Sequence, residues 1–357
     1  MSLSKVVITS PSLSTEDNVS GVSEVVRFII THNKEREYLH FTIGKKDTES
    51  GGLPRRILRI VKTYKKWKHF LVLHPDATVH YSFPLDARSV VRDFFFIGHA
   101  YRRHKKMLVH IHGGLYLTKK KRPWIINRIM RRIFSWDVTF VVLSDLERKI
   151  IQDDFCAKQV EVLPNCVDLT DAQSFTRIYD DAKPLTIGYL GRIEENKGMD
   201  WLLLATERLR REGMAFKLAL AGKEDGRDDY LEKFSHLLDS SFHYCGIVSG
   251  ESKKEFLRNL DVFVLPSYFE GLPMSLLETM SYGCVPVTTP VGSIPEVVRN
   301  DENGIFINKK DDQSIVSAIK TLDGDRSLLQ RLSINARNTI LTEFSPEAYI
   351  GRLNELY

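Results

Sequence analysis

One loop of the sequence combines glycines with two cations, Arg192 and Lys197, over residues 191–198. It follows an apolar run at 185–190 and precedes a helical pattern. Glycine lets the main chain approach a ligand, the start of a helix offers unpaired N–H groups, and the two cations attract an anion. The loop, which begins at Gly191, is therefore a candidate diphosphate site, although its glycine spacing fits neither a Walker A loop nor the GxGxxG pattern. A solvated turn whose cations pair with two glutamates of the same loop explains the residues as well.

Two carboxylates, Glu270 and Glu278, flank the start of a predicted helix near Pro273. Both could reach one ligand, and ionised carboxylates accept hydrogen bonds from sugar hydroxyls. The main-chain N–H groups of Gly271 and Leu272 would point at an anion from the same helix start. The alternative interpretation is that one glutamate caps the helix and the other lies on its surface.

Histidine and glycine come together at 110–114, at the end of a predicted strand. A side chain at that end of a strand is placed to contact a substrate, which makes His112 a candidate substrate ligand. We expect the rings of His110 and His112 to project from opposite faces of the strand, and no Asp or Cys lies nearby to complete a metal site. A structural histidine with satisfied hydrogen bonds is the alternative.

The loop at 18–23 leads from the first predicted strand into a predicted helix. Gly21 would let main-chain amides of that loop meet a phosphate. An ordinary helix start with Ser20 as its cap explains the same residues.

Short apolar runs alternate with helical patterns along the chain, which is typical of strand and helix units on parallel sheets. Ligands of such sheets bind beyond the carboxyl ends of the strands, where all four loops lie. A polar, weakly periodic segment at 168–184 is predicted to link two such series. The predicted strands occupy residues 5–10, 38–43, 78–82, 106–111, 138–143 and 160–163 in the first series, and 185–190, 217–221, 242–245, 262–265, 285–288 and 304–307 in the second.

The fold class is therefore predicted to be α/β with two doubly wound halves. At 357 residues, the chain is long enough for two hydrophobic cores. We predict an N-terminal domain at 1–168, a C-terminal domain at 169–345 and a last helix at 346–357, which is expected to pack back on the first domain.

Charge is unevenly placed, because residues 1–170 hold 29 Lys and Arg against 17 Asp and Glu, whereas the remainder holds 22 against 29. A basic half suggests an anionic neighbour such as a membrane surface, a lipid pyrophosphate or nucleic acid. Two segments, 55–70 and 119–136, combine bases with apolar residues and suit amphipathic helices on anionic lipid. Helices with a core-facing apolar side and a solvated basic side give the same pattern.

The four cysteines stand singly, without the spacing of a zinc site, a redox site or a disulfide framework, so a reducing compartment is expected. The first ten residues hold too short an apolar run for a signal peptide, and no stretch reaches the roughly 18 uncharged apolar residues of a membrane span. We therefore expect a cytoplasmic protein that is at most peripheral on the inner face of the cytoplasmic membrane.

Taken together, the loops resemble glycosyltransferase family four, the retaining nucleotide-sugar transferases with two facing Rossmann-like domains and an interdomain cleft, the glycosyltransferase B-type fold. The matching segments follow the family's order and spacing across most of residues 160–307. They are Val162-Leu163-Pro164-Asn165, Val167-Asp168, Gly191-Arg192, Lys197-Gly198, the strand and turn at 262–267, Glu270-Gly271-Leu272-Pro273 through Glu278, Gly283-Cys284-Val285-Pro286-Val287, the run at 292–298, and Asn303-Gly304.

The resemblance implies a donor site in the C-terminal domain and an acceptor site in the N-terminal domain. Arg192 and Lys197 would hold the donor diphosphate and stabilise charge on the departing nucleotide. Glu278 would bind the ribose hydroxyls, and Glu270 would hold hydroxyls of the transferred sugar. The remaining positions implied by the resemblance are Gly191, Gly271 and Leu272 beside the phosphates, Ile247 and Val248 beside the base, His112 near the sugar and the acceptor, and Gly21 closing on the phosphate from the N-terminal side.

The same resemblance implies same-face displacement, in which the leaving phosphate helps to deprotonate the acceptor hydroxyl. No dedicated base is expected, and Glu270 is treated as a sugar-binding group rather than as the nucleophile of a glycosidase. No metal and no cofactor besides the nucleotide-sugar co-substrate is expected. Two positions depart from the family pattern: Gly21 stands where many relatives have a glycine pair, and Cys166 replaces the usual glycine after Asn165.

The function that the resemblance implies is a metal-independent hexosyltransferase. It would move a sugar from a UDP- or GDP-sugar to a saccharide or lipid-linked saccharide in bacterial surface polysaccharide biosynthesis. A nucleotide-sugar epimerase of the same double-Rossmann plan would also need a diphosphate site, but it would use no acceptor. A non-catalytic sugar-binding protein is a further alternative, whereas nucleic acid is not an expected partner because the aromatic residues lack the interleaving of a base-stacking surface.

Overall fold

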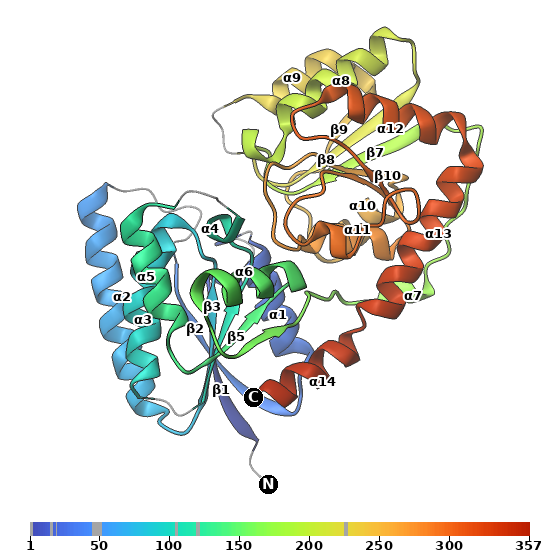
Figure 1. Ribbon diagram of the computed structural model, residues 1–357. Coiled ribbons are helices and arrows are strands. Elements are labelled where there is room, and N and C mark those ends of the chain that lie inside the picture. Colours follow the sequence, from blue (N-terminus) through green and yellow to red (C-terminus); the bar gives the residue numbers. More distant parts are fainter. Residues whose placement is uncertain are drawn as a thin grey trace. The chain divides into compact units, whose positions relative to one another are not determined.

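The computed structural model of the chain describes residues 3–14, 17–18, 20–44, 52–103, 106–118, 122–224 and 228–357. Val19 of the predicted phosphate loop and Lys119 to Lys121 of the second basic segment lie outside the described residues. The chain divides into two compact units, residues 1–165 with 346–357 and residues 166–345, hereafter unit 1 and unit 2 (Figure 1).

Each unit contains one parallel sheet of six strands within the described ranges. The first sheet has the order β2-β1-β3-β4-β5-β6 and the second has the order β12-β11-β10-β7-β8-β9. All twelve strands predicted from the apolar runs are confirmed, with bounds that differ by at most two residues. The strands are β1 (Ser4–Ser10), β2 (Arg36–Thr42), β3 (Thr78–Phe83), β4 (Met107–Ile111), β5 (Thr139–Val142), β6 (Val160–Val162), β7 (Leu185–Leu190), β8 (Phe216–Ala221), β9 (Phe242–Tyr244), β10 (Val262–Leu265), β11 (Val285–Thr288) and β12 (Ile305–Phe306).

Helices alternate with these strands and cover both faces of each sheet (Figure 1). Those of unit 1 are α1 (Gly21–His32), α2 (Leu53–Leu73), α3 (Ala87–Tyr101), α4 (Leu115–Thr118), α5 (Trp124–Phe134), α6 (Asp145–Phe155) and α14 (Pro346–Leu356). Those of unit 2 are α7 (Thr170–Ser174), α8 (Met199–Arg211), α9 (Tyr230–Leu238), α10 (Gly250–Arg258), α11 (Met274–Ser281), α12 (Asp312–Gly324) and α13 (Arg326–Glu343), with the short 3-10 helices η1 (Glu195–Lys197), η2 (Asp239–Ser241) and η3 (Ile294–Glu296).

One face of the first sheet forms an aromatic core with α2, α3 and α5. Trp67 of α2 is fully buried and stacks near Phe41 and Tyr81, and its indole N–H donates to the Phe96 carbonyl at 3.1 Å. Burial of each such side chain contributes roughly 1.5–3 kcal/mol relative to exposure.

The other face of that sheet is covered by α1 and by α14, which returns to unit 1 at the far end of the chain (Figure 1). The Phe28 and Tyr349 rings meet edge to face at 5.9 Å, and Arg352 pairs with Glu161 at 2.6 Å. This face also buries polar side chains, including His80 and His110 of the central strands β3 and β4.

The segment predicted to be a linker, 168–184, is instead part of unit 2 and contains α7. Its polar and aromatic side chains dock on the unit, since Arg177 donates to the Tyr282 carbonyl at 2.9 Å and Phe175 packs on the Tyr282 ring. The segment carries little periodicity because it packs irregularly along the surface of unit 2, not because it is free of contacts.

The second sheet has the strand order of a Rossmann fold, with β7 and β10 adjacent at its centre. From β7, the chain proceeds to one side through β8 and β9, and from β10 to the other through β11 and β12. The loops after β7 and β10 therefore diverge at the point where ligands of doubly wound sheets bind.

Candidate functional site

The loops after β7 and β10 are joined by main-chain contacts. The Tyr268 N–H donates to the Asn196 carbonyl at 3.0 Å. Gly198 has a φ of +81°, and a Cβ there would lie 2.2 Å from the Pro266 carbonyl oxygen. Only glycine fits this position, because a side chain would be both strained and in collision with the main chain. The two predicted ligand loops are thus held against each other.

This contact brings Lys197 and Glu270 together. The Lys197 ammonium lies 2.8 Å from Glu270 Oε1, and the Ser267 hydroxyl donates to the same oxygen at 2.7 Å. Glu270 is only 9% exposed, so its carboxylate is held by charged and neutral donors in a largely dry setting. The resemblance assigned Lys197 to the diphosphate and Glu270 to the sugar of a donor. The structure shows that these two side chains are direct neighbours.

Arg192 is anchored to the same region through its main chain. The buried Tyr189 hydroxyl donates to the Arg192 carbonyl at 2.6 Å, and the Gly191 N–H bonds the Ala221 carbonyl at 3.0 Å. Burial raises the pKa of Tyr189 well above its ordinary value, and the charge of Glu270 raises it further. Tyr189 thus anchors the turn at Gly191-Arg192 from the buried strand β7.

The loop that carries Glu270 rests on the loop after β11. The Ser293 N–H donates to the Gly271 carbonyl at 3.1 Å, and a Cβ on Gly292 would lie 2.0 Å from the Glu270 carbonyl oxygen. Leu272 is buried at 4% exposure, and α11 begins two residues later. The predicted helix start near Pro273 is confirmed, and it places Gly271 and Leu272 directly before the positive end of the helix.

Glu278 of α11 lies beside α10 rather than beside Lys197. Its carboxylate accepts from Lys253 at 2.7 Å, and both side chains are about one-fifth exposed. The sequence gave no signal for Lys253, because its partner is 25 residues away and the pairing depends on how α10 and α11 pack. Lys253 is the functional candidate that the sequence interpretation missed.

Ile247 and Val248 follow β9, in a loop that is tied to the loop after β8. The Gly222 N–H donates to the Gly246 carbonyl at 2.8 Å, and the Tyr244 hydroxyl donates to the Gly222 carbonyl at 2.8 Å. A Cβ on Gly222 would lie 1.8 Å from the Gly191 carbonyl oxygen. The turns after β7, β8 and β9 therefore form one packed edge, with the Ile247 side chain 48% exposed on it.

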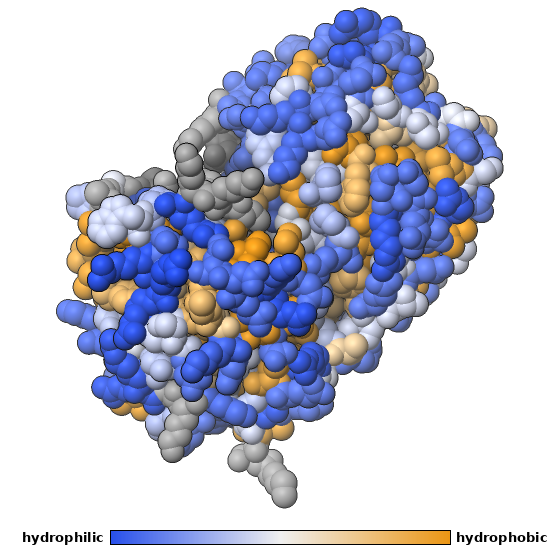
Figure 2. All heavy atoms as spheres, viewed as in Figure 1, coloured by the Kyte–Doolittle hydropathy of each residue, from blue (hydrophilic) through white to orange (hydrophobic). Residues whose placement is uncertain are grey.

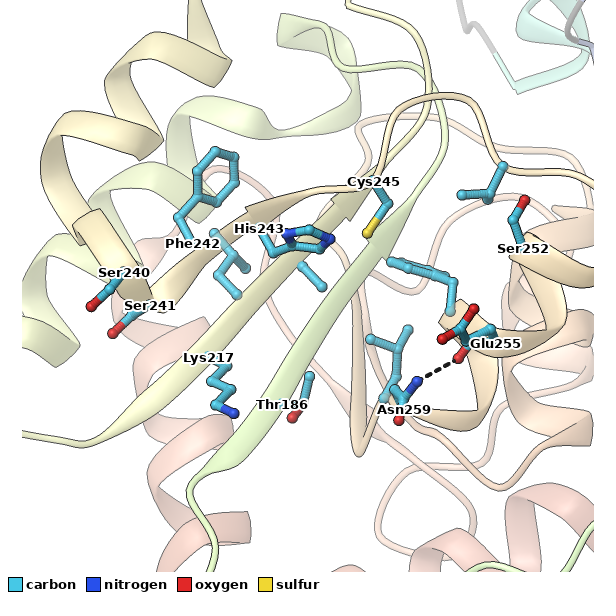
Figure 3. A pocket seen from close by; sticks show the side chains of 15 residues that line it. Thr186, Lys217, Ser240, Ser241, Phe242, His243, Cys245, Ser252, Glu255 and Asn259 are labelled. Carbon is cyan, nitrogen blue, oxygen red and sulfur yellow. Dashed lines mark hydrogen bonds between the residues drawn. The ribbon is translucent and has the colours of Figure 1, made fainter.

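A pocket of about 600 Å³ lies on the face of the second sheet beside α10 (Figure 3). Cys245 and Ser252 line it at one end, and Lys217 and Thr186 line it farther along the strands. Val248 is the one predicted site residue in its lining. The pocket is thus a hollow on the face of the sheet, whereas the Lys197–Glu270 pair lies beyond the carboxyl ends of the central strands β7 and β10.

His112 lies in unit 1, directly after β4. Its ring stacks on that of His110 with centroids 4.1 Å apart, so the expectation that the two rings lie on opposite faces is wrong. The physical reason is the two-residue period of a strand, which puts residues i and i+2 on one face. Burial lowers the pKa of His112 to about 3, so the ring is neutral at physiological pH.

Gly21 is the first residue of α1 in unit 1. The Ser20 side chain caps this helix by accepting from the Ser23 N–H at 3.3 Å, as the ordinary interpretation predicted. A Cβ on Gly21 would meet nothing within 4 Å, so packing within the protein does not require glycine here. The role of Gly21 toward a phosphate stays a prediction.

Cys166, which replaces the usual glycine of the family, is accommodated without strain. It is 3% exposed and is not among the described residues with positive φ. A glycine is therefore not needed at this position. Elsewhere, the structure contains no group of three or more His, Cys, Asp or Glu among its described residues that could hold a metal ion.

Residues 184–325 match the family described as glycosyl transferases group 1. The capsular polysaccharide biosynthesis glycosyltransferase CapM of Staphylococcus aureus is 27% identical over 273 residues, which cover 72% of this chain and 72% of CapM. The putative colanic acid biosynthesis glycosyltransferase WcaL of Escherichia coli is 30% identical over 239 residues, 63% of this chain and 58% of WcaL. The chain spans about half the length of several curated relatives, such as 43% of the uncharacterized glycosyltransferase MJ1607 of Methanocaldococcus jannaschii.

Solved structures resemble the chain over nearly its whole length. Sucrose-phosphate synthase from Thermosynechococcus elongatus has a TM-score of 0.80 at 16% identity and covers 99% of this chain and 98% of its own. Anabaena HepE in complex with UDP-glucose has a TM-score of 0.74 at 14% identity, with 98% of both chains covered. The predicted fold class, two Rossmann-like domains of the glycosyltransferase B type, is confirmed.

The strand order and the structural neighbours show that the chain has the glycosyltransferase B-type fold. Within that fold, the similarity to the glycosyl transferases group 1 covers residues 184–325 of unit 2.

The contact at Gly198 can be tested by replacement with alanine. Gly198→Ala would force apart the loops after β7 and β10, because the new Cβ would meet the Pro266 carbonyl oxygen at 2.2 Å. We expect a loss of stability of roughly 2–4 kcal/mol in urea unfolding. We also expect donor affinity to fall by at least about tenfold.

Gly213→Ala is the matched control, because Gly213 also has a positive φ, +76°, but a Cβ there would meet nothing within 4 Å. It should cost only about 1–2 kcal/mol for the left-handed backbone and leave donor affinity unchanged. Equal effects of the two substitutions on donor affinity would show that the close approach of the loops is unimportant.

Proposed function

We propose that this protein is a retaining hexosyltransferase that transfers a sugar from a UDP- or GDP-sugar to a saccharide acceptor. The observation that carries the proposal is the Lys197–Glu270 pair at 2.8 Å, at the β7–β10 switch point of a glycosyl transferase group 1 domain. One residue of this pair suits a phosphate and the other suits a sugar hydroxyl. The predicted interdomain cleft is part of this proposal.

In the proposed reaction, the bond between the anomeric carbon and the leaving phosphate oxygen breaks, and a bond from the acceptor oxygen forms on the same face of the sugar. The acceptor proton passes to the leaving phosphate. Negative charge therefore grows on the diphosphate, where Lys197 and Arg192 would stabilise it without a metal. No nucleophilic carboxylate is needed, which distinguishes this chemistry from that of a retaining glycosidase.

Glu270 would bind hydroxyls of the transferred sugar while staying paired with Lys197. Both described bonds to its carboxylate go to Oε1, from Lys197 and Ser267. These bonds restrict the motion of the carboxylate before a donor arrives. Little further side-chain entropy would therefore be lost when its second oxygen, Oε2, binds a sugar hydroxyl. Lys197 in turn would bridge Glu270 and the diphosphate.

Glu278 would bind the ribose hydroxyls of the donor. The Lys253 ammonium, at 2.7 Å, would hold the carboxylate in place. The main chain at Ile247 and Val248, which precedes α10, would flank the base. Because Lys253 lies on α10, it links the proposed ribose and base subsites.

The names of the relatives support a saccharide acceptor in surface polysaccharide synthesis. CapM is named for capsular polysaccharide, WcaL for colanic acid, and AmsK of Erwinia amylovora for amylovoran biosynthesis. In unit 1, His112 would contact the sugar and the acceptor with a neutral ring that can both donate and accept a hydrogen bond.

We further propose that the acceptor is lipid-linked and that unit 1 rests on an anionic membrane. Helices α2, α3 and α5 each run back from the carboxyl edge of the first sheet, and their early turns expose apolar side chains. These side chains are Ile57, Leu58 and Val61 of α2, Val91 and Phe95 of α3, and Trp124 and Ile125 of α5, all at least 43% exposed.

Basic side chains lie on the same helices as this exposed apolar set, and Figure 2 shows hydrophilic and hydrophobic residues interspersed over the visible face of unit 1. On α2 they include Arg55, Lys62 and Lys65. Each base near an anionic surface contributes about 1 kcal/mol, and the apolar groups add insertion energy. None of the described helices is long and apolar enough to cross a membrane.

The donor site can be tested by thermal stabilisation with a panel of UDP-, GDP- and ADP-sugars. A donor at 100 times its Kd should stabilise the protein by about 2.7 kcal/mol. Arg192→Ala and Glu278→Ala should each raise the Kd about 10- to 100-fold, because each removes a hydrogen bond to or from a charged group. Both should cut the stabilisation at that donor concentration to roughly 0.4–1.4 kcal/mol.

Lys254→Ala is the control, since Lys254 lies next to Lys253 on α10 but pairs with Asp171 and Glu251 on the surface. It should retain the full shift. Unchanged shifts in both site variants would refute the donor site, and interconversion of the nucleotide-sugar without an acceptor would favour the epimerase alternative.

Membrane contact can be tested by co-sedimentation with liposomes that contain anionic lipid. We expect binding at low salt that weakens as salt is raised, because the Debye length shrinks to about 8 Å at physiological ionic strength. The double variant Leu58→Asp with Trp124→Ala should reduce the bound fraction several-fold. Ile178→Asp in unit 2, where Ile178 is 88% exposed, should not, and wild-type protein that stays in the supernatant at low salt would contradict the proposal.

A further inference from the structure

A row of polar side chains is buried beneath α1 and α14 on one face of the first sheet. His80 of β3 and His110 of β4 are both 0% exposed. His80 Nδ1 lies 2.6 Å from the Tyr357 hydroxyl, and His80 Nε2 lies 3.1 Å from His110 Nδ1. Tyr357 directly follows α14, so residues from opposite ends of the sequence meet inside this unit.

Two hydrogen bonds lead along the row to Tyr357. The Asn33 amide N–H donates to the Tyr38 hydroxyl at 2.8 Å, and the Tyr38 hydroxyl donates to that of Tyr357 at 3.4 Å. The 2.6 Å distance from the Tyr357 hydroxyl to His80 Nδ1 suits donation by the hydroxyl. In that direction, the His80 proton lies on Nε2 and is donated to His110 Nδ1, so that His110 also carries its proton on Nε2.

The row ends at the predicted substrate ligand of unit 1. The His110 ring packs against that of His112, with centroids 4.1 Å apart and ring planes tilted by 31°. Neither His110 Nε2 nor either ring nitrogen of His112 has a hydrogen-bond partner within the described residues. Burial lowers the pKa of His80 to about 3 and that of His110 well below its ordinary value, so both rings are neutral. A neutral imidazole without hydrogen-bond partners can adopt either tautomer. Here the hydrogen bond with Tyr357 selects the tautomer of His80.

We propose that Tyr357 and His80 are positioning residues for His112, and that they act by fixing the tautomer and orientation of the His110 ring on which His112 stacks. This inference rests on the proposed function, in which His112 contacts the sugar and the acceptor. Tyr357 directly follows α14, which is distant in sequence from β3 and β4. One hydrogen-bonded row therefore couples the docking of α14 to the position of His112 in the proposed substrate site.

The tautomers can be measured directly in the full-length protein labelled with 15N-histidine. Long-range 1H–15N NMR spectra distinguish an imidazole that carries its proton on Nε2 from one that carries it on Nδ1. In the wild type at pH 7, we expect His80 and His110, assigned with His80→Gln and His110→Gln, to be neutral and protonated on Nε2. A charged ring, or a proton on Nδ1 of either residue, would overturn the inference even if no variant folds.

Tyr357→Phe removes the hydroxyl that selects the tautomer and keeps the ring that fills the core. We expect the His80 signals of this variant to become a mixture of both tautomers. We also expect kcat to fall by about tenfold while the KM for the donor changes by less than about twofold, because the donor nucleotide binds to unit 2.

Tyr38→Phe is the matched control, because it removes a hydroxyl from the same row but leaves Tyr357 able to donate to His80. It should keep the wild-type tautomers and a kcat within about twofold of wild type. Tyr357→Phe with wild-type spectra and wild-type kcat would overturn the inference. Failure of the proposed function would be recognised separately, as a wild type with the expected tautomers that transfers no sugar.

Discussion

The site in unit 2 depends on the contact between the loops that follow β7 and β10. These strands are neighbours at the centre of the sheet although about 70 residues separate them, and their loops meet where Gly198 touches the Pro266 carbonyl. The approach is possible because the position has no side chain and takes a left-handed backbone. From it follows the pairing of Lys197 with Glu270, which places a cation directly beside a carboxylate.

In unit 1, the main constraint is the burial of polar side chains. Its sheet buries histidines that would be costly to charge, so that burial keeps the rings neutral, and hydrogen bonds pair both ring nitrogens of His80 and Nδ1 of His110. The cover of that face is α14, so the far end of the chain is needed to complete the unit. The same arrangement leaves His112 directly beyond the carboxyl end of the central strand β4, where a ligand of a parallel sheet is expected.

Local patterns predicted most of the fold, because a strand of a parallel sheet is a short apolar run whatever its neighbours are. The motif residues near Lys197 and Glu270 were also found from sequence, since their spacing within each loop resembles a known family. The faces of His110 and His112 were predicted wrongly, although the two-residue period of a strand determines them.

Other features were beyond reach of the sequence because they depend on packing between distant segments. Lys253 meets Glu278 only when α10 lies against α11. Tyr357 meets His80 across 277 residues, and no local pattern indicates which buried ring a tyrosine will reach. The docking of the 168–184 segment on unit 2 likewise depends on side-chain contacts, such as Arg177 with the Tyr282 carbonyl, that a polar composition conceals.

The central claim is that Lys197, held by Glu270, binds the diphosphate of the donor. Calorimetric titration of Lys197→Ala and wild type with a nucleoside diphosphate and with the matching monophosphate tests it most directly. The account predicts that the substitution weakens the diphosphate about 10- to 100-fold and the monophosphate by less than about threefold. Equal weakening of both nucleotides, or unchanged affinity for the diphosphate, would contradict it.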